Sequence, residues 1–484
     1  MLRTTLRVYL SAVNYAHTRR PRAAWPDTRH WRRAQPRDTE TVFRKVRKIE
    51  RPVHRASRCR VAGLVFATAA AVAVGHSQTL QITPSRVLID QTVRICATGL
   101  QPNEHIVMEA RLRDGRDATW QSQAEFVADA QGTVDLSTQA PKQGTYKEVS
   151  GMGLIWSMMP TEKGVGAYRP PPRFGTQQIQ FELLRDGKGI ANAELQQDSI
   201  AEGVKQIKVT GNLHGTLFVP ADSAPHPGVL VVGGSEGGLP AFRAAWLASH
   251  GYAAFALAYF RYEGLPQRLE AIPLEYFGQA LGWMMTRPEI SRDKIAVMGA
   301  SRGGELALQL ASMYPRIKAA VAYVPANVRY RACCGENGVA YAWTWKGLPL
   351  PFARGNERGR DAFDAAIKVE NTQGPILMIG GKDDHVWDSA AMVAAAASRL
   401  KQAHFAYEVE TLIYPHAGHI AGRPEIVPEW SEKVRHPVSG RMIDFGGTPA
   451  GNAQSSIDAI PKVLDFLRRN LSATSVPGKV GPTQ

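Results

Sequence analysis

Cysteine is scarce in this chain of 484 residues, which holds only Cys59, Cys96, Cys333 and Cys334. No pair of Cys-x-x-Cys or His-x-x-x-His motifs has the spacing of a zinc site. Adjacent cysteines such as the last two rarely bond to each other, because the ring that they would close is strained. We therefore predict no disulfide framework, no structural metal and no metal or organic cofactor.

Charge of one sign is concentrated at the N-terminus and nearly absent elsewhere, although the formal net charge is +15. Residues 1–60 contain 17 basic and four acidic side chains, whereas residues 61–484 contain 41 basic and 39 acidic ones. A nucleic-acid-binding fold needs basic side chains on its folded surface, so this distribution predicts no nucleic-acid partner. Because residues 1–60 also hold few aliphatic side chains, they are predicted to form a disordered basic segment.

A stable membrane span is not expected, because it needs about 20 apolar residues. The uncharged run at 61–75 has only 15 residues and ends in small side chains before His76-Ser-Gln78. A basic flank, a short apolar run and a small-residue exit are typical of a secretory signal peptide. We predict that residues 61–77 form such a segment and direct the protein to the periplasm or outside the cell. The alternative is a cytoplasmic protein with a basic tail and a hydrophobic tether.

Residues 78–200 show a period-two alternation of apolar and polar side chains. The segments 79–90, 92–98, 106–113 and 124–129 alternate in this way, and Gly, Pro and Asp residues separate them. Short, evenly spaced strands of this kind predict an N-terminal immunoglobulin-like β-sandwich domain.

Residues 201–472 have a different pattern, in which solid apolar segments alternate with amphipathic ones. The predicted strands are 227–233, 253–259, 295–298, 319–323, 376–379 and 407–413, and the predicted helices are 241–250, 275–287, 302–313, 388–401 and 453–470. Strands buried on both faces belong to a parallel sheet covered by helices, so this domain is predicted to be α/β. Residues 473–484 are predicted to be a flexible tail.

The motif Gly299-Ala-Ser-Arg-Gly303 lies between a predicted strand and a predicted helix. This is the setting of the G-x-S-x-G nucleophile elbow of an α/β-hydrolase domain. Glycines flank the serine because larger side chains would collide in so tight a turn. We predict that Ser301 is a catalytic nucleophile; the alternative, a helix N-cap serine, would not need glycine on both sides.

The acid and the base of such a site follow the serine along the chain, each after a later strand. One predicted strand runs into Asp383 and Asp384, either of which could be the carboxylate. The next runs into His416 and His419. We predict His419, which follows a glycine, as the base; His416 is the alternative and His385 a third candidate.

The glycine-rich loop Gly233-Gly-Ser-Glu-Gly-Gly238 follows the first apolar strand of the α/β domain. It lacks the Gly-Lys-Ser/Thr ending of a phosphate loop and the dinucleotide-binding spacing. At this place a hydrolase supplies a backbone N–H to the oxyanion, and the close approach requires glycine. We predict an oxyanion hole made by the amides of Arg302 and of Ser235 or Glu236.

A long insertion separates the predicted strands that end near residue 325 and begin at residue 376. It contains Cys333, Cys334 and the aromatic run Tyr341-Ala-Trp-Thr-Trp345. It either roofs the site and shapes an acyl pocket or forms a surface loop with packed aromatic side chains.

Motifs from roughly residue 80 to residue 471 resemble those of the acyl-CoA thioesterase and bile acid-CoA:amino acid N-acyltransferase family. They are Thr83-Pro-Ser-Arg-Val87, Ala97-Thr-Gly-Leu100, Val134-Asp-Leu-Ser137, Met152-Gly-Leu-Ile-Trp-Ser157, Gly251-Tyr-Ala-Ala-Phe-Ala-Leu-Ala-Tyr-Phe260, Leu274-Glu-Tyr-Phe277, Gly299-Ala-Ser-Arg-Gly-Gly-Glu305, Asp383-Asp-His-Val-Trp387, Tyr414-Pro-His-Ala-Gly-His419 and Gly446-Gly447. The resemblance implies a β-sandwich joined to an α/β-hydrolase domain related to dienelactone hydrolases. It also implies Ser301 as nucleophile, Asp384 as acid and His419 as base.

The same resemblance implies that the protein hydrolyses an acyl-CoA thioester to a fatty acid and CoA through an acyl-serine. Amino-acid-conjugating members of the family use cysteine, so Ser301 favours transfer of the acyl group to water. The expected partner is a small-molecule acyl thioester or ester. The alternatives are acyl transfer to an amino acid amine, an exported carboxylesterase acting on a non-CoA ester, and a surface binding module with an inert hydrolase domain.

Overall fold

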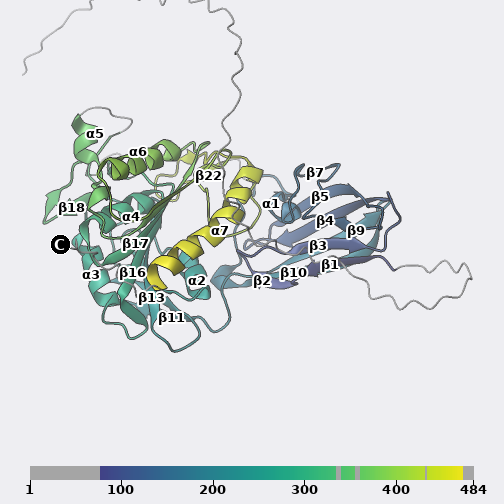
Figure 1. Cartoon of the computed structure of the whole chain (residues 1–484), viewed down its shortest axis with the longest axis horizontal. Helices are drawn as coiled ribbons and strands as arrows, with labels where there is room; N and C mark the ends of the chain where they lie inside the picture. The colour runs from purple at the N-terminus through teal and green to yellow at the C-terminus, as the bar shows by residue number, and fades with distance from the viewer. Residues whose placement is uncertain (1–76, 334–338, 355–359, 431–432, 473–484) are drawn as a thin grey trace, which may run out of the picture. The chain divides into compact units, whose positions relative to one another are not determined.

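The computed structural model (Figure 1) describes residues 77–333, 339–354, 360–430 and 433–472, all within one compact unit. The predicted basic segment 1–60, nearly all of the predicted signal segment 61–77 and the predicted tail 473–484 lie outside the described residues.

The N-terminal part of the described chain is a β domain of two sheets. Its elements are β1 (Thr79–Thr83), β2 (Arg86–Leu88), β3 (Arg94–Thr98), β4 (His105–Arg113), β5 (Thr119–Val127), β6 (Val134–Asp135), β7 (Gln143–Gly144), α1 (Gly153–Trp156), β8 (Met159–Pro160), η1 (Pro172–Phe174), β9 (Thr176–Arg185) and β10 (Lys188–Asp198). One sheet has the order β1-β3-β6 and the other β2-β10-β9-β4-β5-β7, with β8 paired to β5. Alternate residues of β4 and β5 are buried, as the period-two pattern predicts, and they share one core with β1 and β3.

The C-terminal part is built on an eight-stranded sheet. Its elements are β11 (Lys205–Val209), β12 (His214–Val219), β13 (His226–Val232), α2 (Ala241–Ser249), β14 (Ala253–Ala258), β15 (Ile272–Pro273), α3 (Glu275–Met284), β16 (Ile290–Ala300), α4 (Arg302–Met313), β17 (Ile317–Tyr323), β18 (Trp343–Trp345), β19 (Leu348–Pro349), α5 (Arg360–Ala365), η2 (Val369–Asn371), β20 (Ile376–Gly381), α6 (Ser389–Gln402), β21 (Val409–Tyr414), β22 (Val434–Arg435), β23 (Met442–Ile443) and α7 (Pro449–Ser472).

The strand order of this sheet is β11-β12-β14-β13-β16-β17-β20-β21. The strands from β14 to β21 run parallel to one another, whereas β12 is antiparallel to both β11 and β14. A mostly parallel sheet with an antiparallel second strand and one exchanged pair is the α/β-hydrolase fold, as the sequence predicts.

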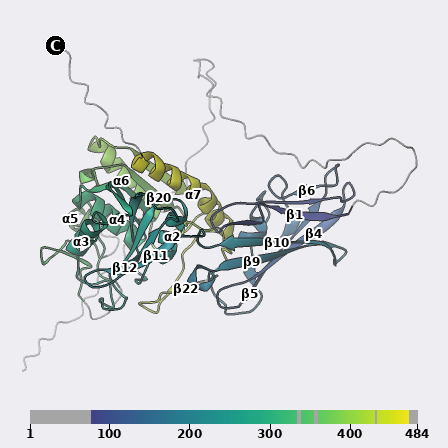
Figure 2. The ribbon, with the colours of Figure 1, turned by 90° about the horizontal axis from the view of Figure 1, so that it is seen from below.

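Helices cover both faces of the sheet, which explains why its strands are solidly apolar. In β13, Val229 and Val231 pack with α2 and α7, whereas Leu230 and Val232 pack with α3, α4 and α6. Figure 1 shows α7 (yellow) lying across the sheet, and Figure 2 shows α4 and α6 on the side opposite to α7. The carboxyl ends of the parallel strands are left free to carry loops.

The two domains contact each other through buried polar groups and aromatic rings. Asp90 of the β domain accepts hydrogen bonds from Trp246 Nε1 (2.9 Å) and His250 Nε2 (2.8 Å) on α2. Trp120 lies edge-on to Trp430, with 6.4 Å between the ring centroids. One hydrophobic cluster includes side chains of the β domain, of one sheet face and of α7, so the domains share a core.

One expectation about the cysteines is wrong. Cys333 is disulfide-bonded, whereas Cys96 on β3 has a buried side chain. A single bridge in a loop requires only one suitably placed second thiol, and neither cysteine content nor motif spacing reveals such a local arrangement. Cys333 lies in the long insertion between β17 and β20.

Candidate active site

Four loops at the carboxyl edge of the sheet carry the predicted site residues. Ser301 follows β16, Asp384 follows β20, His419 follows β21 and the loop 233–238 follows β13. Carboxyl ends of parallel strands meet at one edge of a sheet, so residues far apart in the sequence come together there.

Ser301 sits in a strained turn between β16 and α4. Its backbone angles are φ 58° and ψ −122°, and its N–H donates to the Tyr323 carbonyl at 2.9 Å. A Cβ at Gly299 would lie 2.1 Å from the Gly303 carbonyl oxygen, and one at Gly303 would lie 2.5 Å from the Gly233 carbonyl oxygen. Both glycines of the motif are therefore required by close backbone packing.

The Ser301 hydroxyl, the His419 imidazole and the Asp384 carboxylate form a continuous hydrogen-bonded chain. Ser301 Oγ lies 2.8 Å from His419 Nε2, and His419 Nδ1 lies 2.9 Å and 3.0 Å from the two Asp384 oxygens. The Asp384 side chain is fully buried and that of His419 is 6% exposed. This arrangement can take a proton from the serine and stabilise the resulting imidazolium.

The alternatives that the sequence left open lie elsewhere. Asp383 bonds His385 Nε2 (3.1 Å) and the Gly447 N–H (3.2 Å), not His419. His416 is exposed and does not line the cavity that contains Ser301. Hydrogen bonds to Asp444 and Asp383 raise the pKa of the exposed His385 imidazole above its ordinary value.

Several groups that hold His419 and Asp384 were not predicted from the sequence. The His419 N–H donates to the Phe445 carbonyl at 2.6 Å, and the Trp387 ring lies edge-on to the imidazole at 5.1 Å. The Val386 and Trp387 N–H groups donate to Asp384 Oδ1 at 2.9 Å and 3.2 Å. These contacts fix the orientation of the imidazole and the carboxylate.

Gly446 and Gly447 join the loop of the acid to the loop of the histidine. Gly446 pairs with Asp384 and Gly447 with Ala417 as single β-bridges. Both glycines have left-handed backbone angles, and a Cβ at Gly446 would lie 1.9 Å from the Asp383 carbonyl oxygen. The Gly-Gly pair before α7 is the sequence signal that could have indicated this junction.

Backbone N–H groups are available beside the serine. In the part of the chain that the structure describes, the N–H groups of Ser235, Glu236 and Arg302 donate to no protein acceptor. All three residues line the cavity that contains Ser301. Free N–H groups at a helix start and in a glycine-rich loop are suited to bind an oxyanion.

The cavity at the site has a volume of about 810 Å³. Its apolar lining comes from the residues Ala332, Val386, Trp387, Ile420, Met442, Ile443 and Phe445. Arg331 and Arg441 also line it, both are exposed, and no carboxylate among the described residues lies within 4.0 Å of either guanidinium. The cavity thus combines an apolar wall with cationic groups that are available to an anionic ligand.

A buried polar cluster attaches the long insertion to α4. Glu305 of α4 accepts from Trp343 Nε1 at 2.7 Å and pairs with Arg302 Nε at 3.1 Å. Burial raises the pKa of the Glu305 carboxyl and lowers that of the Arg329 guanidinium. Tyr330, Arg331, Ala332 and Cys333 of the insertion line the cavity, which favours its role as a wall of the site over that of a plain surface loop.

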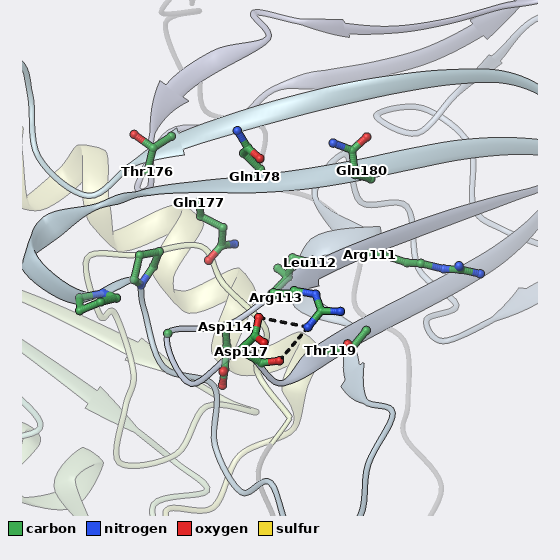
Figure 3. A pocket seen from close by; sticks show the side chains of 13 residues that line it. Arg111, Leu112, Arg113, Asp114, Asp117, Thr119, Thr176, Gln177, Gln178 and Gln180 are labelled. Carbon is green, nitrogen blue, oxygen red and sulfur yellow. Dashed lines mark hydrogen bonds and ion pairs between the residues drawn. The ribbon is translucent and has the colours of Figure 1, made fainter.

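A second cavity, of about 730 Å³, lies on the β domain (Figure 3) and contains none of the predicted site residues. Arg113 at its edge pairs with Asp117 at 3.1 Å. Within the described ranges, no cluster of three or more His, Cys, Asp or Glu side chains could hold a metal ion. In the same ranges, no helix is both long enough and apolar enough to cross a membrane.

Comparison with known proteins finds family models that match both domains. The model described as "Acyl-CoA thioester hydrolase/BAAT N-terminal region" matches residues 90–211. The model described as "BAAT / Acyl-CoA thioester hydrolase C terminal" matches residues 272–336 and 354–473. Together the two models match more than half of the chain.

Two individual relatives are similar to this chain over almost their full length, and one solved structure is similar over a smaller part of its length. Acyl-coenzyme A thioesterase 1 of Homo sapiens is 31% identical over 423 residues, covering 83% of this chain and 99% of the relative. Peroxisomal succinyl-coenzyme A thioesterase of Mus musculus is 28% identical over 428 residues, covering 82% and 97%. The solved acylaminoacyl peptidase of Pyrococcus horikoshii has 13% identity and a TM-score of 0.41, covering 81% of this chain and 61% of that one.

Proposed function

Because the chain belongs to the acyl-CoA thioester hydrolase/BAAT family, we propose that it hydrolyses acyl-CoA thioesters through an acyl-serine intermediate. The observation that carries the proposal is the hydrogen-bonded series from Ser301 Oγ through His419 to Asp384. A serine hydroxyl is a weak nucleophile, and this series supplies both a base and a group that orients the base.

In the first half of the reaction, Ser301 Oγ attacks the thioester carbonyl carbon while its proton passes to His419 Nε2. The carbonyl oxygen becomes an oxyanion, which accepts hydrogen bonds from the N–H groups of Arg302 and of the loop 233–238. Asp384 holds the imidazole with Nδ1 protonated and stabilises the imidazolium. When the oxyanion collapses, the carbon–sulfur bond breaks and His419 gives its proton to the departing sulfur.

In the second half, water replaces the thiol. His419 takes a proton from water, the hydroxide oxygen bonds to the acyl carbon, and the carbon–oxygen bond to Ser301 breaks. The proton returns from His419 to Ser301 Oγ, and a carboxylic acid leaves. An oxygen ester is less reactive toward amines than a thioester, so a serine nucleophile favours hydrolysis over amide formation.

Two features of the cavity support a CoA thioester as substrate. The apolar wall suits an acyl chain, and Arg331 and Arg441 suit the phosphates of CoA, because guanidinium groups bind phosphate through charge-assisted hydrogen bonds.

The test is the variant Ser301→Ala with decanoyl-CoA as substrate. The assay measures the free thiol of CoA that hydrolysis releases. We expect kcat to fall by at least about 10⁴-fold, because the nucleophile is removed. The melting temperature should stay unchanged, because the Ser301 side chain lines an open cavity and is only partly buried. A fluorophosphonate probe should label the wild-type protein at Ser301 and leave the variant unlabelled.

Ser291→Ala is the matched control, because Ser291 lies at the opposite end of the same strand, β16. It should keep wild-type activity and labelling. Full activity of Ser301→Ala would overturn the serine mechanism, and absence of labelling and turnover in the wild type would favour an inert hydrolase domain. Amide formed in the presence of glycine or taurine would favour acyl transfer.

A further inference from the structure

We propose that the Ser235 side-chain hydroxyl is an additional donor to the oxyanion and that His436 is the residue that positions it. The inference rests on the proposed hydrolytic function. It adds a side-chain donor, Ser235, and a positioning residue, His436, to the backbone N–H groups of the oxyanion hole. It follows from the packing of the loop 233–238 against the elbow and from the hydrogen bonds of His436.

The loop that carries Ser235 is packed directly against the elbow that carries Ser301. Strands β13 and β16 are parallel neighbours with Val232 opposite Gly299, so the two loops leave the sheet side by side. A Cβ at Gly234 would lie 3.1 Å from the Ala300 carbonyl oxygen. Ser235 and Ser301 both line the same cavity.

His436 reaches Ser235 from the turn between β22 and β23. Its Nε2 lies 3.0 Å from Ser235 Oγ, and its side chain is buried. The turn is held by hydrogen bonds from the His436 N–H to the Arg441 carbonyl and from the Gly440 N–H to the His436 carbonyl, both at 2.8 Å. The imidazole is therefore fixed in place rather than free to swing.

The proton of the His436 ring is on Nε2. The backbone N–H of Ser439 donates to His436 Nδ1 at 3.1 Å, and a backbone amide can only donate, so Nδ1 carries no proton. Burial lowers the pKa of His436, Arg261 also lowers it and Glu236 opposes them, which favours the neutral ring with Nε2–H. His436 consequently donates to Ser235 Oγ.

The hydrogen bond from His436 does not use the hydroxyl proton of Ser235. Ser235 Oγ accepts from His436, and among the described residues no protein acceptor takes the Ser235 hydroxyl proton. A hydroxyl has one donor, so that proton is available to a group in the cavity. The group that gains negative charge beside Ser301 during the reaction is the carbonyl oxygen, and a fixed donor stabilises it most in the transition state.

The first test is Ser235→Ala, assayed with p-nitrophenyl butyrate and with decanoyl-CoA. We expect kcat to fall about 10²-fold, as when one oxyanion donor is removed, with KM changed by less than about threefold. A trifluoromethyl ketone, which forms a tetrahedral oxyanion with the serine, should bind about 10²-fold more weakly. Ser235→Thr keeps a hydroxyl and should recover most of the lost kcat.

The second test separates the two nitrogen atoms of His436. In His436→Gln the side-chain amide can still donate near the position of Nε2, whereas in His436→Asn it is too short to reach Ser235. We expect Gln to retain more kcat than Asn at similar melting temperatures, and adding Ser235→Ala to His436→Asn should cause little further loss. His416→Asn, at an exposed histidine outside the cavity, is the control and should behave as wild type.

The outcomes distinguish this inference from the proposed function. If Ser301→Ala abolishes turnover but Ser235→Ala keeps kcat and inhibitor affinity, hydrolysis stands and the Ser235 donor is rejected. A rise in KM alone would also reject it, since that result indicates ground-state binding. If the wild type neither turns over substrate nor reacts with a fluorophosphonate, the hydrolytic function itself fails.

Discussion

At the scale of single residues, Arg441 offers a way to identify the leaving group. It lines the cavity directly before β23, is exposed, and has no carboxylate within 4.0 Å among the described residues. In Arg441→Ala we expect KM for decanoyl-CoA to rise about tenfold, since a charge-assisted hydrogen bond contributes about 1.5–3 kcal/mol. KM for decanoyl-N-acetylcysteamine, a thioester without phosphates, should stay unchanged.

Arg292→Ala is the control for charge, because Arg292 is exposed on the opposite end of β16. It should leave KM for both thioesters at the wild-type value. An equal effect of Arg441→Ala on both thioesters would argue against phosphate recognition, and would place Arg441 against the acyl portion instead.

The three site residues could be predicted from their order along the chain. The choice between neighbouring candidates required the three-dimensional structure. Ser301, Asp384 and His419 follow the ends of β16, β20 and β21 in the order that the fold requires, and the structure brings the three side chains together. Asp383 and Asp384 could not be separated by position, because both follow β20. Their burial and partners differ, and these depend on the Gly446-Gly447 segment, which is distant in the sequence.

The residues that the sequence analysis missed have no local pattern. The roles of His436 and Glu305 follow only from their hydrogen bonds to residues on other elements. His436 bonds Ser235, and Glu305 bonds Trp343. A lone histidine on a loop or a lone carboxylate on a helix is consistent with a plain solvated side chain. Tertiary contacts alone distinguish the two cases.

At the scale of elements, the insertion between β17 and β20 depends on one buried guanidinium. Arg329 donates to Gln309 Oε1 on α4 at 2.9 Å and to the carbonyl oxygens of Pro351, Asp364 and Ala366. Arg329→Met fills a similar volume without a donor, and it leaves the buried Gln309 Oε1 and the three partly buried carbonyl oxygens without this partner. We expect a loss of about 2–4 kcal/mol in the free energy of unfolding, measured by urea denaturation.

The same variant should expose the insertion to protease before the rest of the chain, because its attachment to α4 is lost. Arg316→Met, at an exposed arginine, is the matched control and should change neither quantity. Unaltered stability together with unaltered proteolysis would show that the apolar contacts of the insertion suffice to hold it.

Elements with strong periodicity were predicted closely, and weakly apolar ones were not. The helix predicted at 302–313 has those bounds, and the helix predicted at 388–401 is α6, Ser389–Gln402. Strand β10 was missed because it contains few large apolar residues and most of its residues are only partly buried. Strand β12 was also missed. It is the second strand of the sheet, antiparallel to β11 and β14, and it begins with His214-Gly-Thr216, which is not a solid apolar segment.

At the scale of the whole molecule, the shared core predicts one unfolding transition for both domains. Asp90→Ala removes the acceptor of Trp246 and His250 at the contact between the domains. We expect a loss of about 2–4 kcal/mol, because the buried Trp246 and the half-buried His250 both lose their acceptor. Differential scanning calorimetry should show a single peak in both proteins, shifted to lower temperature in the variant.

Asp293→Ala, at an exposed aspartate on β16, serves as the control and should leave the peak where it is. Two separate peaks in the wild type, or a variant in which only part of the enthalpy moves, would mean that the β domain unfolds independently.

The Gly446-Gly447 bridge also bears on how the enzyme is made. Ser301, Asp384 and His419 are all synthesised before Phe445, Gly446 and Gly447, yet those later residues hold the acid and histidine loops together. A growing polypeptide therefore contains all three reactive side chains before it contains the segment that aligns them. The aligned site therefore requires the segment that directly precedes α7, the last helix of the described chain.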